Sequence, residues 1–173
     1  MNDKKYEQKR LSAAAVLVAA VQAGLNDKKL FQRLCDIWFA YKRGEPFIGP
    51  KGGIQSLSIP RNKNWKELPP APKRVGGAAD FVSTGALEVK RSGVGLVMLD
   101  HSVPQSELRR GLFRIHGITP EKVEDYLQRT FRLALITRDE DKRFGSVLSS
   151  EMPPDWDGKD VTVRYRAAGI DLT

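Results

Sequence analysis

The chain places an aspartate and a histidine side by side at the end of a short apolar run. The run covers residues 94–99, Asp100 and His101 follow it at once, and Pro104 stands three residues later. Imidazole titrates near neutral pH and a carboxylate is a hard oxygen donor, so this pair is suited to acid–base or metal chemistry. No other strand-like segment delivers a titratable pair to its end in this way, and the pair is the first candidate site.

The pattern Asp100-His101-x-x-Pro104 resembles the first half of the His-Me finger, or HNH, nuclease motif, in which a strand ends in Asp-His-x-x-Pro. The resemblance implies that Asp100 is a ligand of a divalent metal ion. It also implies that His101 is the catalytic general base, which activates water against a phosphodiester.

The same resemblance implies a second strand followed by a helix that supplies another metal ligand. Residues 133–136 form a second apolar run, and the helix expected after it carries Asp139 and Asp141 in its first turn. The implied centre therefore has Asp100 and one of these two aspartates holding Mg²⁺ or Mn²⁺. The chain departs from the family in having two helices between the strands and no Asn or His on the second helix.

A structural explanation of these residues stays open beside the catalytic one. Asp100 and His101 would then form a hydrogen-bonded strand end, with Pro104 in the first turn of the next helix. Thr137 and Glu140 match the S/T-x-x-E capping box, and the helix dipole accounts for the aspartates next to them.

Positive charge points to an anionic partner. The chain has 29 Lys and Arg against 21 Asp and Glu, a net charge of +8 and a pI near 9.7, which favours nucleic acid through phosphate attraction. Residues 42–75 contain eight basic and two acidic side chains, and a helix over 104–115 presents a further basic ridge. The candidate nucleic-acid contacts are Lys51, Arg61, Lys63, Trp65, Lys66, Lys73, Arg74, Arg109, Arg110 and Arg114. Trp65 either stacks on a base or pins its loop onto the core.

Composition excludes several other classes of protein. With one cysteine, Cys35, and two histidines, the 173 residues form no internal disulfide and no zinc site of four cysteines or of two cysteines and two histidines. Cys35 is expected to fill the core. The apolar segment 13–20 is shorter than the roughly 20 residues that span a bilayer, so we expect no membrane association and a cytoplasmic location. The run 49–53 does not match the phosphate-loop pattern.

Periodicity and capping signals predict a mainly α protein with two or three short strands, in the α+β class. One compact helical domain over 1–173 is expected, with a small strand-strand-helix element. It consists of a helical portion 1–44, a Pro- and Gly-rich basic loop 45–77 with little regular structure, and an α+β portion 78–173. Helices are predicted over 4–23, 27–43, 78–90, 104–115, 120–131, 138–148 and 161–168, and strands over 54–59, 94–99 and 133–136.

The leading hypothesis is a nucleic-acid-binding protein, acting on DNA or RNA, with a variant His-Me finger centre for metal-dependent cleavage. One alternative is a noncatalytic nucleic-acid-binding module, such as a regulator or accessory protein of a mobile element. Another is a protein-interaction module, such as an inhibitor, with no cofactor. The hypotheses differ in whether the strand that ends near residue 136 lies beside the one that ends near residue 99, and in whether the carboxylates converge.

Overall fold

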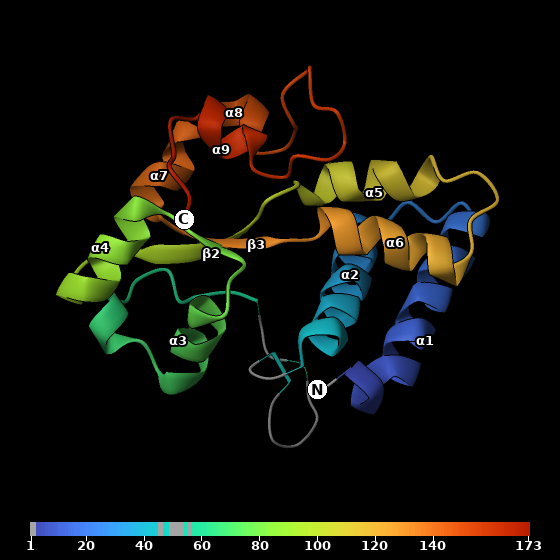
Figure 1. Ribbon diagram of the computed structural model, residues 1–173, viewed down its shortest axis with the longest axis horizontal. Helices are drawn as coiled ribbons and strands as arrows, with labels where there is room; N and C mark the ends of the chain where they lie inside the picture. Colours follow the sequence, from blue (N-terminus) through green and yellow to red (C-terminus); the bar gives the residue numbers. More distant parts are fainter. Residues whose placement is uncertain (1–2, 45–46, 49–53, 55–56) are drawn as a thin grey trace. The chain divides into compact units, whose positions relative to one another are not determined.

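The computed structural model describes residues 3–44, 47–48, 54 and 57–173 (Figure 1). Helices dominate, and one small sheet has three strands, so the predicted α+β class with a mainly helical content is confirmed. The chain divides into two compact units, each built from two stretches of sequence. Unit 1 comprises Met1–Gln55 and Gln105–Phe131, and unit 2 comprises Ser56–Pro104 and Arg132–Thr173. That the whole chain is one domain stays a prediction.

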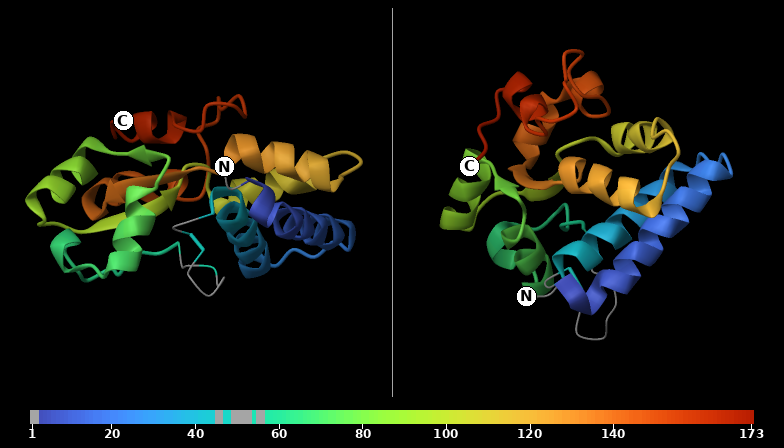
Figure 2. Two further views of the ribbon diagram at one scale, coloured as in Figure 1. Left: turned by 60° about the horizontal axis from the view of Figure 1, so that its bottom comes forward. Right: turned by 45° about the vertical axis from the view of Figure 1, so that its right-hand side comes forward.

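The described residues of unit 1 form four helices. They are α1 (Asp3–Gln22), α2 (Lys28–Arg43), α5 (Gln105–Phe113) and α6 (Pro120–Thr130). Figure 2 shows α1 and α2 lying side by side and antiparallel, joined by a short turn that begins at Gly24, where φ is +67°. Helix α6 packs on α1, and α5 packs on both α2 and α6. In the described part of the chain, no helix combines the length and hydropathy needed to cross a membrane.

The core of unit 1 lies along one face of α2. Phe31, Cys35 and Phe39 are all buried, and the Phe39 ring stacks on Phe131 with the ring centroids 4.7 Å apart. Burial raises the pKa of the Cys35 thiol well above its usual range, as expected for a cysteine that fills a core. The neighbouring face of α2 is buried only in part, since Leu30 at its start is 38% exposed.

Unit 2 contains the sheet, whose strand order is β1-β3-β2. The strands are β1 (Phe81–Val82), β2 (Val97–His101) and β3 (Leu133–Thr137). Strands β2 and β3 pair antiparallel, whereas β1 and β3 pair parallel. The outer edge of β1 is covered by the last residues of the chain, because Thr173 and Val82 exchange two backbone hydrogen bonds.

Strand β3 is buried on both faces, which explains its unbroken apolar run. On one face, Ala134 and Ile136 pack with Phe144, Tyr165 and Ile170. These three partners come from the chain after the sheet, which includes α7 (Arg138–Arg143), α8 (Gly145–Leu148) and α9 (Val163–Ala167).

The other face of β3 is covered by a helix that the prediction of an irregular 45–77 loop missed. Helix α3 (Pro70–Gly77) follows the short 3₁₀ helix η1 (Trp65–Glu67). A Cβ atom added to Gly76 of α3 would stand 3.3 Å from side-chain atoms of Trp65 and of Leu135 in β3. Helix α3 can therefore lie this close to β3 because glycine has no side chain. Pro70 and Pro72 did not prevent the helix, because first-turn N–H groups have no intrahelical acceptor.

Other predicted boundaries differ from the structure by a few residues. The helix predicted over 78–90 is α4 (Thr84–Ser92), because Phe81–Val82 joins the sheet and Ser83 caps the helix. The helix predicted over 138–148 is divided at Gly145, where φ is +59°. Of the strand predicted over 54–59, Ile54 forms an isolated bridge with Ile48, residues 57–59 are not a strand, and 55–56 lie outside the described residues.

Candidate functional site

Asp100 lies within β2, not beyond its end as the apolar run suggested. It pairs with Ala134 of β3, and paired residues of antiparallel strands share a face of the sheet. Asp100 is therefore on the face that Tyr165 covers. The alternation of side chains along a strand directs His101, the next residue, toward the opposite face.

The carboxylate of Asp100 is held by two neighbouring residues of α9. Arg164 donates a charge-assisted hydrogen bond to Asp100 Oδ2, and the Tyr165 hydroxyl donates to the same oxygen at 2.7 Å. The Arg164 side chain is 1% exposed and that of Asp100 is 15% exposed. The pair is thus a buried ion pair, with Tyr165 as an additional donor.

The same guanidinium joins three segments of unit 2. Besides Asp100, it donates to the carbonyl of His101 at 2.7 Å and to the carbonyl of Leu148, the last residue of α8, at 2.8 Å. Its carbon lies 4.2 Å from the ring centroid of Phe144 and 5.3 Å from that of Tyr165, in cation–π range. Arg164 therefore fixes α8 and α9 to β2.

The pKa of the Asp100 carboxyl reflects its burial and its charged neighbours. Burial raises the pKa of the Asp100 carboxyl; Arg164, the Tyr165 hydrogen bond and His101 act to lower it, and the charge of Asp141 raises it further. Burial also raises the pKa of Tyr165 well above its usual range. The Asp141 charge is the smallest of these influences on the Asp100 carboxyl, so it does not by itself bring the two carboxylates together as a metal site.

The other parts of the predicted metal centre are not gathered around Asp100. Because Val97 pairs with Thr137, α7 begins about 13 Å along β2 from His101, at roughly 3.4 Å per residue. Asp139 in the first turn of α7 is 84% exposed and forms an ion pair with Lys142. Among the described residues, no group of three His, Cys, Asp or Glu side chains is placed to hold a metal ion.

Of the two arrangements that the nuclease hypothesis requires, paired strands and converging carboxylates, the structure shows the first. Strands β2 and β3 do lie side by side, as the hypothesis requires, but the Asp100 carboxylate is already bound by Arg164 and Tyr165. The roles of His101 as general base, and of Asp100, Asp139 and Asp141 as metal ligands, stay predictions. The contacts favour the structural alternative, a hydrogen-bonded strand end.

A second buried carboxylate lies where two helices begin. Glu140 Oε2 accepts hydrogen bonds from the Thr137 backbone N–H at 2.7 Å and from the Ser83 hydroxyl at 2.6 Å. The Thr137 hydroxyl accepts from Glu140 N–H, so the predicted capping box is confirmed. Strands β1 and β3 are parallel, so the N-termini of α4 and α7 meet at one sheet edge, which in open α/β sheets is a common anion site. Here the carboxylate of Glu140 supplies that anion.

We expect Glu140→Gln to lower the free energy of unfolding by about 1 to 3 kcal/mol. Thr137 and Ser83 both donate to Oε2, and an amide oxygen can accept both bonds, but it carries no full negative charge, so two charge-assisted hydrogen bonds are weakened. Urea unfolding is the measurement, with Glu88→Gln as the exposed control. Equal losses in the two variants would contradict the capping role of Glu140.

The predicted nucleic-acid contacts are divided between the two units. Lys51 lies outside the described residues. In unit 2, Lys73 donates to the carbonyl of Lys66, and the exposed side chains are those of Arg61, Lys63, Lys66 and Arg74. Arg109 and Arg110 of α5, and Arg114 directly after it, belong to unit 1.

Trp65 has the contacts of a residue that anchors its segment. Its side chain is half-buried, and Lys90 Nζ lies 5.9 Å from the ring centroid. The ring packs against Gly76, where an added Cβ atom would stand 3.3 Å from it. The backbone N–H of Trp65 donates to the carbonyl of Gly95. These contacts favour packing of the loop over stacking on a base.

The structure brings a second basic segment to the α5 arginines. Arg109 donates to the carbonyl of Asn26 at 3.0 Å, and the ring of Phe113 lies 5.5 Å from that of Phe31. These contacts set the N-terminus of α2 beside α5. These two neighbouring segments carry five cations, of which Arg110 forms an ion pair with Glu107 at 2.7 Å. We call the set the α2–α5 basic patch: Lys28, Lys29, Arg109, Arg110 and Arg114.

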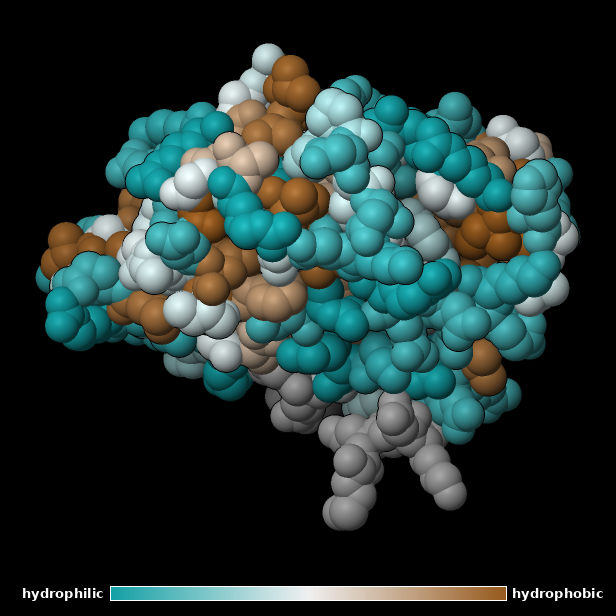
Figure 3. All heavy atoms as spheres, turned by 45° about the horizontal axis from the view of Figure 1, so that its top comes forward, coloured by the Kyte–Doolittle hydropathy of each residue, from teal (hydrophilic) through white to brown (hydrophobic). Residues whose placement is uncertain are grey.

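Sequence reasoning missed Lys28 and Lys29, although one signal was present. They follow the N-cap Asp27 directly, and the first turn of α2 contains no acidic residue. The helix dipole disfavours cations at this end, so two lysines here serve no evident local purpose. The surface of unit 1 on the right in Figure 3 is largely hydrophilic, and unit 1 has 15 basic against 9 acidic residues, compared with 14 against 12 in unit 2.

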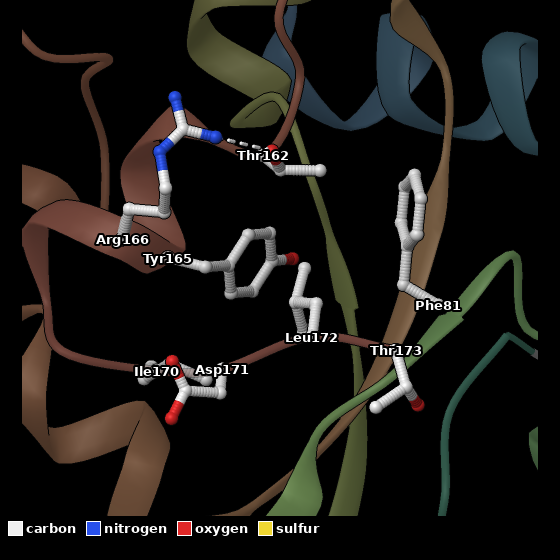
Figure 4. Close-up of a pocket in the computed structure, with 8 residues that line it drawn as sticks. All are labelled: Phe81, Thr162, Tyr165, Arg166, Ile170, Asp171, Leu172 and Thr173. Atoms are coloured by element: carbon white, nitrogen blue, oxygen red, sulfur yellow. Dashed lines mark hydrogen bonds between the residues drawn. The ribbon is translucent and has the colours of Figure 1, made fainter.

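Unit 2 has a pocket of about 340 Å³ lined by Tyr165, the residue whose hydroxyl binds Asp100 (Figure 4). The ring of Tyr165 lines it together with Phe81 and residues of the C-terminal segment. Arg166 at its edge donates to Thr162 at 2.9 Å and to Asp160 at 2.5 Å. The bond from Arg166, followed by those from the hydroxyl and the backbone N–H of Thr162, lowers the pKa of Asp160 to about 2. Arg166 and Asp160 are thus paired with each other.

Comparisons with protein-family models, with curated proteins and with solved structures found no match to this chain.

Proposed function

We propose that this protein is a noncatalytic nucleic-acid-binding module whose contact surface is the α2–α5 basic patch. The observation that carries the proposal is the hydrogen bond from Arg109 to Asn26, which sets Lys28 and Lys29 beside the arginines of α5. Two basic segments that are far apart in sequence thereby form one surface. A phosphate backbone attracts such a surface without regard to base sequence.

The expected affinity falls steeply with salt. If the five patch cations each neutralise a phosphate, the logarithm of the binding constant falls with the logarithm of salt concentration with a slope of about −3.5 on single strands and −4.5 on duplex. Filter binding between about 50 and 200 mM salt, without added metal, measures this slope. Retention that is absent, or that is insensitive to salt, would overturn the proposal.

Metal-dependent cleavage is the second candidate function. The observation in its favour is that β2, which contains Asp100 and His101, pairs with β3, the strand that leads into the helix with Asp139 and Asp141. Plasmid and single-stranded substrates incubated with Mg²⁺ or Mn²⁺ test it. Cleavage that His101→Ala abolishes would establish a catalytic centre, whereas intact substrates that remain bound would leave the binding function alone.

A further inference from the structure

Apolar side chains stand among the cations of the α2–α5 basic patch. Leu25, Leu30 and Phe113 are 49%, 38% and 39% exposed. Leu25 precedes Asn26, whose carbonyl binds Arg109, and Leu30 is in the first turn of α2. Single exposed apolar residues are ordinary on a protein surface, but a group of three among cations marks an interaction site.

Phe113 is the central member of this group. It is the last residue of α5, and its ring packs against the buried ring of Phe31 with an angle of 44° between the ring planes. Arg109 and Arg110 precede it by four and three residues, so they are its neighbours on the helix surface. Phe113 is therefore held from one side, partly open to solvent on the other, and flanked by cations.

This arrangement distinguishes between two kinds of nucleic acid. A duplex presents phosphates and groove edges, which cations contact but on which an aromatic ring cannot stack. A single strand presents unstacked bases, each with a flat π-face next to its phosphate. An exposed aromatic ring beside cations therefore favours the second, because stacking on it requires no unstacking of a duplex.

We propose that Phe113 is a base-stacking platform and that the ligand of the α2–α5 basic patch is single-stranded nucleic acid. The inference rests on the proposed function and deepens it. The arginines and lysines contact the phosphates, the ring of Phe113 stacks on one base, and Leu25 and Leu30 cover apolar surface of the neighbouring bases.

Fluorescence anisotropy with a labelled single strand of about 12 nucleotides, and with the duplex of the same length, tests the inference. Wild-type protein is expected to bind the single strand more tightly. Phe113→Leu keeps an apolar side chain but removes the π-face, so single-strand affinity should fall about fivefold or more while duplex affinity and the salt slope stay unchanged. Phe113→Trp should retain single-strand binding.

Two controls keep the outcomes separate. Val147→Ala removes an exposed apolar residue of unit 2 and should change neither affinity, and thermal unfolding checks that each variant folds. Salt-sensitive binding with equal affinity for both ligands, and no effect of Phe113→Leu, would overturn the stacking inference and leave the proposed function standing. Binding of neither ligand would overturn both the stacking inference and the proposed function. The next partner to test for the α2–α5 basic patch would then be an acidic protein.

Discussion

Arg164→Met is expected to lower the free energy of unfolding by about 3 to 5 kcal/mol, the largest effect of any single substitution proposed for this protein. The variant leaves the Asp100 carboxylate buried without its cation, and it removes the donor to the carbonyls of His101 and Leu148. Chemical denaturation with urea, followed by tryptophan fluorescence, measures the loss.

Arg166→Met is the matched control, two residues further on. Arg166 also pairs with an aspartate, Asp160, but its side chain is 62% exposed, so its removal should cost less than about 1 kcal/mol. The double variant Asp100→Asn with Arg164→Met should recover part of the loss, because no unpaired charge is left buried. A loss in Arg164→Met no larger than in the control would contradict the structural role of the pair.

The triple variant Lys28→Gln, Lys29→Gln and Arg114→Gln is expected to weaken nucleic-acid binding about 100-fold near 0.1 M salt. Each lost phosphate contact also lowers the salt slope by about 0.7 to 0.9, so the slope should fall by about 2 to 3. Stability should be unchanged or slightly higher, because Lys28 and Lys29 oppose the dipole of α2.

A second triple variant separates this patch from the basic loop of unit 2. Arg61→Gln, Lys63→Gln and Lys66→Gln remove the same number of exposed charges from residues that the sequence singled out. If the α2–α5 basic patch is the contact surface, this variant retains most of the affinity and of the salt slope. A larger loss here than in the first variant would move the binding surface to the loop.

The partners of Asp100 illustrate what sequence reasoning about this chain missed. The Asp-His pair was conspicuous because it follows an apolar run, yet Arg164 and Tyr165 lie 64 and 65 residues further on. No local pattern connects two segments so far apart. Only the packing of α9 on β2 reveals that the carboxylate has a buried cation, and this contact favours the structural explanation of Asp100 that the sequence had left open.

Local chemistry was sufficient where a helix begins or ends. Thr119 and Pro120 start α6, Thr137 and Glu140 form the capping box of α7, and Gly93 ends α4 with a φ of +74°. Each of these signals acts within one turn of the chain, through a side chain or a backbone angle that belongs to the residue itself. Helix α3 was missed because proline was weighed as a helix breaker without regard to its place in the first turn.

The sequence alone therefore determined the mainly helical α+β class, most of the helices, two of the three strands and the excess of positive charge. These depend on composition, on periodicity and on caps that act over a few residues. Tertiary structure decided that β2 pairs with β3, that Asp100 is bound by Arg164, and that Lys28 and Lys29 join the arginines of α5. The reason is that each of these three arrangements depends on contacts between segments distant in sequence, which compete across the whole chain and leave no mark in a local pattern.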